Sequence, residues 1–439
     1  MNLIQSIAAN KNYPLFAGQN KQRNNTAVLF TQAPDTFTRT TAGISFKGQN
    51  RNDTSNGRFL KGLEGITDPY SGVTILTFDQ MQNISKELNQ KPNTRAKVAY
   101  LKKYESSMLP VERNIFRLFE FETEKDRFTN FSEMLQSQKP FSMNQLRKEQ
   151  IAVLDKIEEA SANMSPKNRK IVAAELKEGR KRIYKDDEKH PFKRKAFINK
   201  LIKHQCEEIL DKTEKEILSK RKFEGLEELA EATERFQTEQ LEHAKDGKTP
   251  VDLIIDLKHK YLPDYNDEYK DIINIARKLP TSNTSVHAFV IKYADRSNKE
   301  IGERLLNQSV ATIEHIDADS LGGENEAANF MLTTKARNEA RGNLPIRAFI
   351  KMYPGIPKYS QKYMNDIINS IHKGKLKGYE WYPYLLKDKL AENGINVDIS
   401  KYKIPQQKAF RTLPPRLHDK YPNYQKYIPE KGEPLNLRY

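Results

Sequence analysis

The sequence has almost no cysteine, the residue that forms disulfide bonds in secreted domains and binds structural zinc. Cys206 is the only cysteine among 439 residues, which excludes an intrachain disulfide and any zinc site built from cysteine pairs. No window approaches about 18 apolar residues, so we expect no transmembrane helix and no membrane partner. The N-terminus also lacks the basic segment and apolar core of a secretory signal. A cytoplasmic location is therefore expected, with secretion as an effector or toxin left open.

Acidic residues are outnumbered by basic ones. The chain has 74 Lys and Arg against 58 Asp and Glu, a formal net charge of +16. This surplus indicates an acidic partner, and nucleic acid is the usual one. The alternative is that charge spread over a long chain only aids solubility. A mean hydropathy of −0.80 and 30% charged residues predict a modest core, with extended helices or disordered arms.

The residue types divide the chain into four segments, in keeping with the two or three folding units that its length suggests. Residues 1–75 are rich in Asn, Thr, Gly and Gln, which predicts a mostly disordered basic arm. Residues 76–250 predict a helical, possibly coiled-coil-like region. Residues 251–399 hold the most informative motif and its supporting helices, and residues 400–439 predict an extended basic tail. The expected fold class is mainly α with a small α+β unit, an elongated helical region and irregular tails.

The helical region leaves two interpretations open. Apolar residues recur three and four apart over residues 145–162, 166–184 and 192–241, and a break near Gly225 predicts two long helices or a hairpin. These helices are either a solvated scaffold or an arm that grips DNA or another partner. The second interpretation would use a basic cluster made of Arg194, Lys195, Lys200 and Lys203.

Two further helices are expected around the motif. Ser297 and Glu300 form a capping box ahead of residues 301–306. Ser360 is expected to start a helix over residues 361–372, which Gly374 would close. Just beyond it comes an aromatic cluster, for which packing in a core or hinge is favoured over base stacking: Tyr379, Trp381, Tyr382 and Tyr384.

The most informative stretch is residues 309–343. In residues 309–316 every second side chain tends to be β-branched, a pattern that predicts a strand. Residues 317–326 include Gly322-Gly323 and are expected to form a loop. A second strand is expected over residues 329–332. Thr333 or Thr334 is expected to cap a following helix, with Gly342 at its C-terminal end. Glu314 and His315 are neighbours on the first strand, so their side chains should point to opposite faces unless the strand bends.

This order of elements resembles the HNH nuclease family and its ββα-metal motif, in the His-Asn-Asn variant. The residues that carry the resemblance are Glu314-His315-Ile316, the glycine pair, Asn329 followed by Phe330, and Asn338 in the helix. The match is tight over roughly a tenth of the chain and looser from residue 297 to about residue 377. The chain departs from many members in having Glu314 where Asp is common, and in lacking the cysteine pairs that bind a structural zinc.

The resemblance implies a metal-dependent endonuclease that hydrolyses phosphodiester bonds in DNA, with RNA left open. It implies His315 as the general base on water, Glu314 and Asn338 as ligands of one Mg²⁺ or Mn²⁺, and Asn329 as the residue that orients the histidine or the scissile phosphate. These residue types suit the chemistry. A neutral imidazole can accept a proton at pH 7, and a hard cation prefers oxygen ligands and stabilises a developing alkoxide.

The helix after the second strand predicts an anion site. Its N-terminus near Thr334 favours phosphate, and Lys335, Arg337 and Arg341 are expected to hold flanking phosphates. The competing hypothesis is a non-catalytic nucleic-acid-binding or interaction protein on a degenerate HNH scaffold, because a histidine beside an acid is commonly a surface pair and asparagines in turns are commonly structural. The sequence makes no prediction of oligomeric state.

Overall fold

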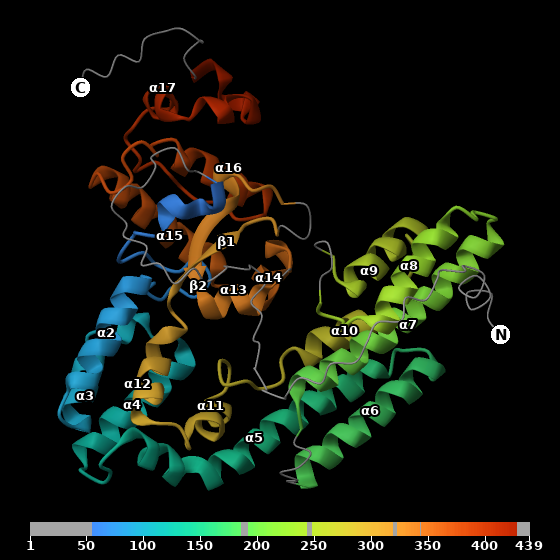
Figure 1. Cartoon of the computed structure of the whole chain (residues 1–439), viewed down its shortest axis with the longest axis horizontal. Coiled ribbons are helices and arrows are strands. Elements are labelled where there is room, and N and C mark those ends of the chain that lie inside the picture. The colour runs from blue at the N-terminus through green and yellow to red at the C-terminus, as the bar shows by residue number, and fades with distance from the viewer. Residues whose placement is uncertain (1–54, 186–191, 244–247, 319–322, 343, 428–439) are drawn as a thin grey trace, which may run out of the picture. The chain divides into compact units, whose positions relative to one another are not determined.

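The computed structural model describes residues 55–185, 192–243, 248–318, 323–342 and 344–427. Within these residues the chain is mainly helical and has a single two-stranded sheet (Figure 1). The expectation of a mainly α protein with a small β unit is therefore confirmed. A search of the same residues finds no helix with both the length and the apolar character needed to cross a membrane.

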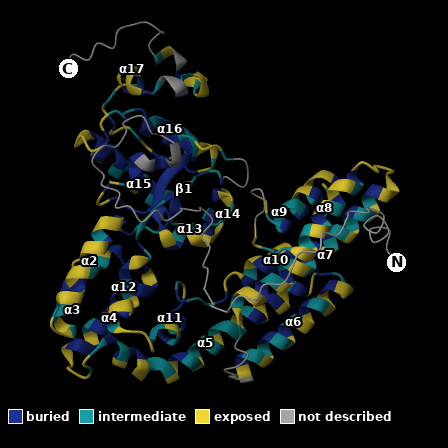
Figure 2. Ribbon diagram, viewed as in Figure 1, coloured by how far each residue is buried: buried dark blue, intermediate teal, exposed yellow. Residues whose placement is uncertain are grey.

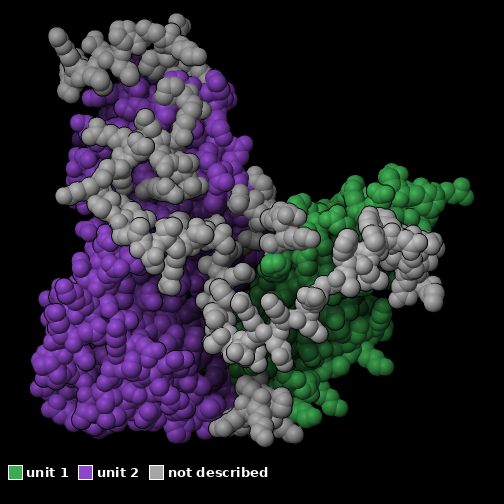
Figure 3. Space-filling view, viewed as in Figure 1, with its two compact units in different colours: residues 1–38, 149–279 green, residues 39–148, 280–439 purple. Residues whose placement is uncertain are grey.

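The chain divides into two compact units, coloured separately in Figure 3. Among the described residues, the first unit comes from residues 149–279 and the second from residues 55–148 and 280–427. The boundary at residue 148 falls inside a long helix, α5 (Phe131–Ser161). This division differs from the expected one, because apolar residues between 76 and 135 share a core with residues 289–306 instead of joining the helical unit.

The first unit consists of helices whose apolar faces bury two clusters of side chains. Figure 2 shows how buried and exposed residues alternate around these helices. The break expected near Gly225 is confirmed, since one helix ends at Ser219 and the next begins at Gly225. Cys206 is buried there, and burial raises the pKa of its thiol to about 12. After the end of α5, the helices are α6 (Pro166–Lys185), α7 (Arg194–Ser219), α8 (Gly225–Thr238), α9 (Pro250–Tyr261) and α10 (Glu268–Ala276).

The charges of this unit are balanced. Residues 149–279 contain 28 Lys and Arg and 28 Asp and Glu, so the whole surplus of 16 lies elsewhere in the chain. Each member of the expected basic cluster has a partner within the unit: Lys195 pairs with Glu242, Lys200 with Glu175 and Lys203 with Glu207, and Arg194 donates to the carbonyl of Arg277. This balance favours the scaffold interpretation over the DNA-gripping one.

The N-terminal part of the second unit is also helical. The capping box of Ser297 and Glu300 is confirmed at the start of α12. Arg304 of that helix forms a buried ion pair with Glu112 of α4. Besides the first half of α5, the helices here are α2 (Phe78–Gln90), α3 (Thr94–Lys102), α4 (Pro110–Glu124), α11 (Val286–Tyr293) and α12 (Asn298–Asn307), and the 3-10 turn η2 (Glu105–Ser107) lies between α3 and α4.

The motif forms a hairpin followed by a helix. Strand β1 (Ala311–His315) pairs antiparallel with β2 (Phe330–Thr334), and His315 lies opposite Phe330. A 3-10 turn, η4 (Ala327–Asn329), leads into β2, and α13 (Lys335–Arg341) follows it directly. The predicted order of strand, loop, strand and helix is confirmed. The first strand is shorter than expected, and the second begins one residue later and extends to Thr334.

Helices α14 (Ile346–Met352), α15 (Ile356–His372) and α16 (Tyr382–Glu392) surround the hairpin (Figure 1). Two tyrosines hold β2 in place. The hydroxyl of Tyr363 accepts a hydrogen bond from the Leu332 amide at 3.0 Å, and that of Tyr382 donates to the Phe330 carbonyl at 2.6 Å. Helix α15 begins at Ile356, earlier than expected, because a proline in its first turn is already suited to helical geometry.

The expected N-terminal arm is wrong for residues 55–75, whereas residues 1–54 lie outside the described residues. Residues 55–60 form the 3-10 turn η1 (Ser55–Leu60), and Phe59, Leu60 and Ile66 are buried in the same core as the hairpin. The Phe59 ring stacks on Tyr379 at 4.5 Å. Residue composition misses this segment because its few apolar side chains pack against residues far away in the sequence.

The expected C-terminal tail is likewise wrong for residues 400–427, and residues 428–439 lie outside the described residues. Phe410 and Tyr424 are buried and stacked at 4.2 Å. The aromatic cluster before this segment is packed as expected, with Trp381 and Tyr382 fully buried. The short helices of the segment are α17 (Gln406–Ala409), η5 (Phe410–Thr412), η6 (Pro415–Lys420) and η7 (Pro422–Tyr427).

Candidate active site

His315 ends strand β1 and is half-buried. Its ring packs edge-on against Phe330 of the partner strand, with ring centroids 4.8 Å apart. Its Nε2 atom lies 2.8 Å from Oδ1 of Asn325 in the loop between the strands. An amide oxygen at that place accepts a hydrogen bond from Nε2–H, which favours the tautomer whose Nδ1 is free to act as a base. Asn325 gives no signal in the sequence, because asparagines in polar loops are common turn residues.

Glu314 points to the opposite side of β1, toward α13, as the alternation of a strand predicts. It is 3% exposed and pairs with Arg341. The same guanidinium donates to the carbonyls of His315, Ile316 and Leu344. Arg341 is therefore buried at the end of β1, whereas a surface position against phosphate was the expectation. The physical reason is that one carboxylate and three carbonyls satisfy its donors inside the protein.

Asn338 joins α13 to the same side of β1. Its Nδ2 atom donates to Thr312 Oγ1 at 3.3 Å and to the Ile313 carbonyl at 3.1 Å. Within the described part of the chain, its Oδ1 atom accepts no hydrogen bond. Asn338 and Arg341 are three residues apart and share one face of α13. Glu314 and Asn338 thus both belong to the interface between β1 and α13.

This interface has oxygen donors of the kind that a hard divalent cation takes, but Arg341 already holds the Glu314 carboxylate, on the side of β1 opposite to the His315 ring. Among the residues that the structure describes, no three His, Cys, Asp or Glu side chains are grouped to hold a metal. The set that the motif suggests is different, with one carboxylate from Glu314 and one amide oxygen from Asn338. Mg²⁺ is commonly bound by one or two protein oxygens, with waters and phosphate oxygens completing its shell. Such an ion would share the Glu314 carboxylate with Arg341.

Asn329 closes the loop between the strands. Its side chain is 1% exposed and makes three hydrogen bonds to the backbone. Oδ1 accepts from the Asp317 amide at 2.7 Å, and Nδ2 donates to the carbonyls of Asp317 at 3.0 Å and Glu324 at 2.9 Å. Asn329 therefore contacts neither the histidine ring nor the surface. It fixes the backbone two residues after His315 and one residue before Asn325, so any effect on the histidine is indirect.

A glycine is required at position 323. The Gly323 amide donates to the Ala318 carbonyl at 3.0 Å, and a Cβ atom on Gly323 would overlap the carbonyl of Asp317. The close approach of two backbone segments explains the second glycine of the motif. The first, Gly322, lies outside the described residues.

Asp68 anchors the junction between β2 and α13, a role that sequence reasoning misses. Its buried carboxylate accepts hydrogen bonds from the Thr333 hydroxyl at 2.6 Å and the Thr334 amide at 3.1 Å. Thr334 is the N-cap residue of α13, as expected, but its hydroxyl makes no cap hydrogen bond. An acidic side chain at a helix N-terminus is favourable. No local pattern indicates this contact, because Asp68 and Thr334 are 266 residues apart in the chain.

The remaining expected phosphate contacts differ in exposure. Lys335 is exposed in the first turn of α13, with its amine 4.0 Å from Glu339. Arg337 is partly buried, and its guanidinium lies 4.7 Å from the centre of the Tyr353 ring. Of the three cations named for this role, Lys335 is the one whose side chain faces solvent.

No family model matches the chain, and neither a curated protein nor a solved structure matches it. The similarity to HNH nucleases therefore depends on the motif of residues 309–343 and on the strand, strand and helix that they form.

Proposed function

We propose that this protein is a metal-dependent endonuclease of the HNH type that hydrolyses phosphodiester bonds, with DNA as the expected substrate. The observation that supports this most is the placement of His315. It ends a hairpin strand, has Nε2 held by Asn325 at 2.8 Å, and is followed by a loop that Asn329 ties closed. A general base needs this kind of fixed ring with one nitrogen free.

In the proposed reaction, Nδ1 of His315 takes the proton from the attacking water. Asn325 holds the other ring nitrogen and so keeps the basic nitrogen aimed in one direction. Asn329 positions the loop and Lys335 binds a flanking phosphate. Glu314 and Asn338 would hold the Mg²⁺ or Mn²⁺, which when bound supplies charge neutralisation at the phosphate and the leaving oxygen.

The charge distribution supports a nucleic-acid substrate. Residues 341–427 contain 17 Lys and Arg but only 6 Asp and Glu, in contrast to the balanced helical unit. A nucleic-acid backbone is the polyanion that such a surplus attracts. The positive charge thus gathers in the part of the chain that follows the candidate site in sequence and shares its core.

A non-catalytic nucleic-acid-binding protein on the same scaffold is the second candidate. The observation that favours it is the ion pair between Glu314 and Arg341, because a guanidinium already neutralises the carboxylate that a metal would use. The two candidates differ in one respect that is easily measured, since only the nuclease depends on a divalent cation to break phosphodiester bonds.

The direct test uses purified full-length protein with supercoiled plasmid, single-stranded DNA and RNA in separate reactions. Each substrate is incubated with Mg²⁺, with Mn²⁺ and with EDTA. The proposal predicts nicked or linear plasmid in the presence of a divalent cation and none with EDTA. Binding to the same substrates without any cleavage would support the second candidate instead.

A further inference from the structure

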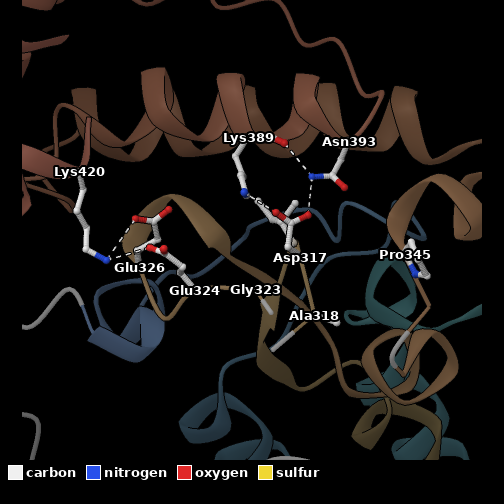
Figure 4. Close-up of a pocket in the computed structure, with 10 residues that line it drawn as sticks. Asp317, Ala318, Gly323, Glu324, Glu326, Pro345, Lys389, Asn393 and Lys420 are labelled. Atoms are coloured by element: carbon white, nitrogen blue, oxygen red, sulfur yellow. Dashed lines mark hydrogen bonds and ion pairs between the residues drawn. The ribbon is translucent and has the colours of Figure 1, made fainter. Parts of the chain in front are cut away.

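A cavity of about 520 Å³ lies beside the loop that follows His315. Figure 4 shows that the loop contributes Asp317, Glu324 and Glu326, while Lys389 reaches down from α16 and Asn393 from the C-cap position of that helix. Lys420, at the end of η6, approaches from another side. Each of these charged or amide groups is paired with another across the cavity, so its walls connect the loop to the C-terminal part of the second unit.

Two side chains hold Asp317, one from α16 and one from the residue that caps its C-terminus. Lys389 forms an ion pair with its Oδ2 atom, and Nδ2 of Asn393 donates to its Oδ1 atom at 2.9 Å. The Lys389 side chain is 19% exposed and the Asp317 side chain 37% exposed. Burial lowers the pKa of the Lys389 amine, but Asp317 and Glu392 together outweigh burial and raise the pKa. The Lys389 amine therefore stays charged over the neutral range.

A second, weaker ion pair holds the part of the loop that contains Glu324 and Glu326. The amine of Lys420 lies 3.0 Å from Glu324 and 3.9 Å from Glu326. Because Lys420 is 44% exposed and Glu324 66% exposed, solvent screens this pair and it contributes little alone. Of the two ties, the one between Lys389 and Asp317 is the better shielded. In sequence, Asp317 is two residues after His315, and Glu324 is next to Asn325, which contacts the His315 ring.

These contacts connect α16 to the His315 ring through the loop. Asp317 is fixed by its side chain to Lys389 and by its backbone to Asn329, and Asn329 in turn fixes Glu324, the neighbour of Asn325. We propose that Lys389 is a positioning residue for His315, acting by holding Asp317 and through it the loop that presents Asn325. The expected effect of Lys389 on the cleavage rate rests on the proposed nuclease function. Its expected effect on the order of the loop does not.

The structural consequence is measured without metal or nucleic acid. Hydrogen exchange followed by mass spectrometry is compared over peptides covering residues 315–330 in the full-length protein. Lys389→Met, which keeps the aliphatic chain, should speed exchange there by about tenfold, as expected when a partly exposed charge-assisted hydrogen bond is lost. Lys389→Arg should stay within about twofold of wild type. Lys387→Met, an exposed lysine of the same helix, is the matched control and should not change the loop.

The catalytic consequence separates positioning from binding. Lys389→Met should lower kcat by about tenfold while KM stays within about twofold, and Lys389→Arg should restore kcat. Should Lys389→Met fail to fold, Asp317→Asn removes the same ion pair from the loop side and should give the same pattern. Unchanged loop exchange in both variants overturns the positioning role even if the protein cleaves DNA. Faster exchange in a protein that never cleaves DNA contradicts only the nuclease function.

Discussion

Glu314 is confined between β1 and α13 by Arg341, and this determines which substitution tests its role. Replacing Glu314 with Ala would leave a buried guanidinium without its counter-charge, a change that costs about 3–5 kcal/mol. Glu314→Gln retains an oxygen that can accept the hydrogen bond of Arg341 while removing the carboxylate charge. The glutamine variant is therefore the informative one for metal binding.

The metal assignment predicts a change in the requirement for Mg²⁺. Glu314→Gln and Asn338→Ala should each raise the Mg²⁺ concentration that gives half-maximal cleavage by about tenfold or more, because the first replaces a charged carboxylate ligand with a neutral amide and the second removes an amide ligand. The measurement is the cleavage rate as a function of Mg²⁺ concentration at saturating DNA. A half-maximal concentration equal to that of wild type in both variants would remove these residues from the metal site.

Asn329→Ala is the matched control for that experiment. The Asn329 side chain is bound entirely to loop backbone, so its loss should slow cleavage without changing the Mg²⁺ requirement. If Asn329→Ala shifts the Mg²⁺ requirement and Asn338→Ala does not, the assignment of the two asparagines is reversed.

Glu326 should make folding stability depend on pH. Burial, and then the charge of Glu324, raise the pKa of Glu326 above its ordinary value, and Lys420, Lys389 and Tyr421 offset this only in part. Because the folded-state pKa is raised, the stability that this group contributes is complete below the unfolded pKa and is lost as the pH rises through the folded pKa. Glu326→Gln should therefore unfold at a higher temperature than wild type at pH 7.5.

The difference between the two proteins should shrink as the pH falls toward the ordinary pKa of glutamate. Thermal unfolding of both proteins at pH 7.5 and pH 5 measures it, with Glu324→Gln as the control. Glu324→Gln removes both the repulsion on Glu326 and a solvent-screened ion pair with Lys420, so it should change the unfolding temperature less than Glu326→Gln does. A Glu326→Gln protein that is less stable than wild type at pH 7.5 contradicts this account of the charge.

Among the elements, η1 shows how closely the N-terminal segment packs on the hairpin. Gly57 has a φ of +62°, and a Cβ atom there would lie 2.9 Å from Ile313 of β1 and 2.9 Å from Phe330 of β2. Gly57→Ala should lower the free energy of unfolding by about 2–4 kcal/mol, from overpacking together with a left-handed backbone. Chemical denaturation of both proteins measures this loss.

Gly62 provides the control for that substitution. No atom lies within 4 Å of a Cβ built there, and its φ is outside the left-handed region. Gly62→Ala should therefore change stability by less than about 1 kcal/mol. Equal losses in the two variants would mean that η1 does not pack on the hairpin as described.

The hairpin and its helix were predictable because their signals are local. Alternating β-branched residues mark β1, and Gly342 with a φ of +51° ends α13 where expected. The contacts that position the site are not local. Asp68 reaches Thr334 across 266 residues, and Lys389 reaches Asp317 from α16. A single sequence has no pattern that pairs Asp68 with Thr334 or Lys389 with Asp317. The motif is therefore predictable from the sequence, and these long-range contacts are not.

At the scale of the whole molecule, positive charge is segregated. The helical unit is neutral over residues 149–279, whereas residues 341–427 are strongly basic. If nucleic acid is the partner, salt-dependent affinity should come from the second unit and not from the helices of the first. Lys335, Lys351 and Lys358 are all exposed, and changing all three to Glu should weaken binding to duplex DNA. It should also reduce the slope of log K against log salt by about 2 or more, because each phosphate contact contributes about 0.9.

The control set applies the same charge change to α6 of the helical unit. Lys170, Lys177 and Lys181 are also exposed, and changing all three to Glu should alter the slope by less than about 1. Fluorescence anisotropy of a labelled duplex in EDTA at several salt concentrations compares the two sets. A larger loss from the α6 set would restore the helical unit as the DNA-gripping arm.

Single-turnover cleavage by His315→Ala measures whether His315 is the general base. His259→Ala, which removes an exposed histidine of α9, is the control. With saturating enzyme and Mg²⁺, His315→Ala should cleave about 10²–10⁴-fold more slowly than wild type, with DNA affinity unchanged, and His259→Ala should cleave at the wild-type rate. Cleavage by His315→Ala at the wild-type rate would mean that His315 is not the general base.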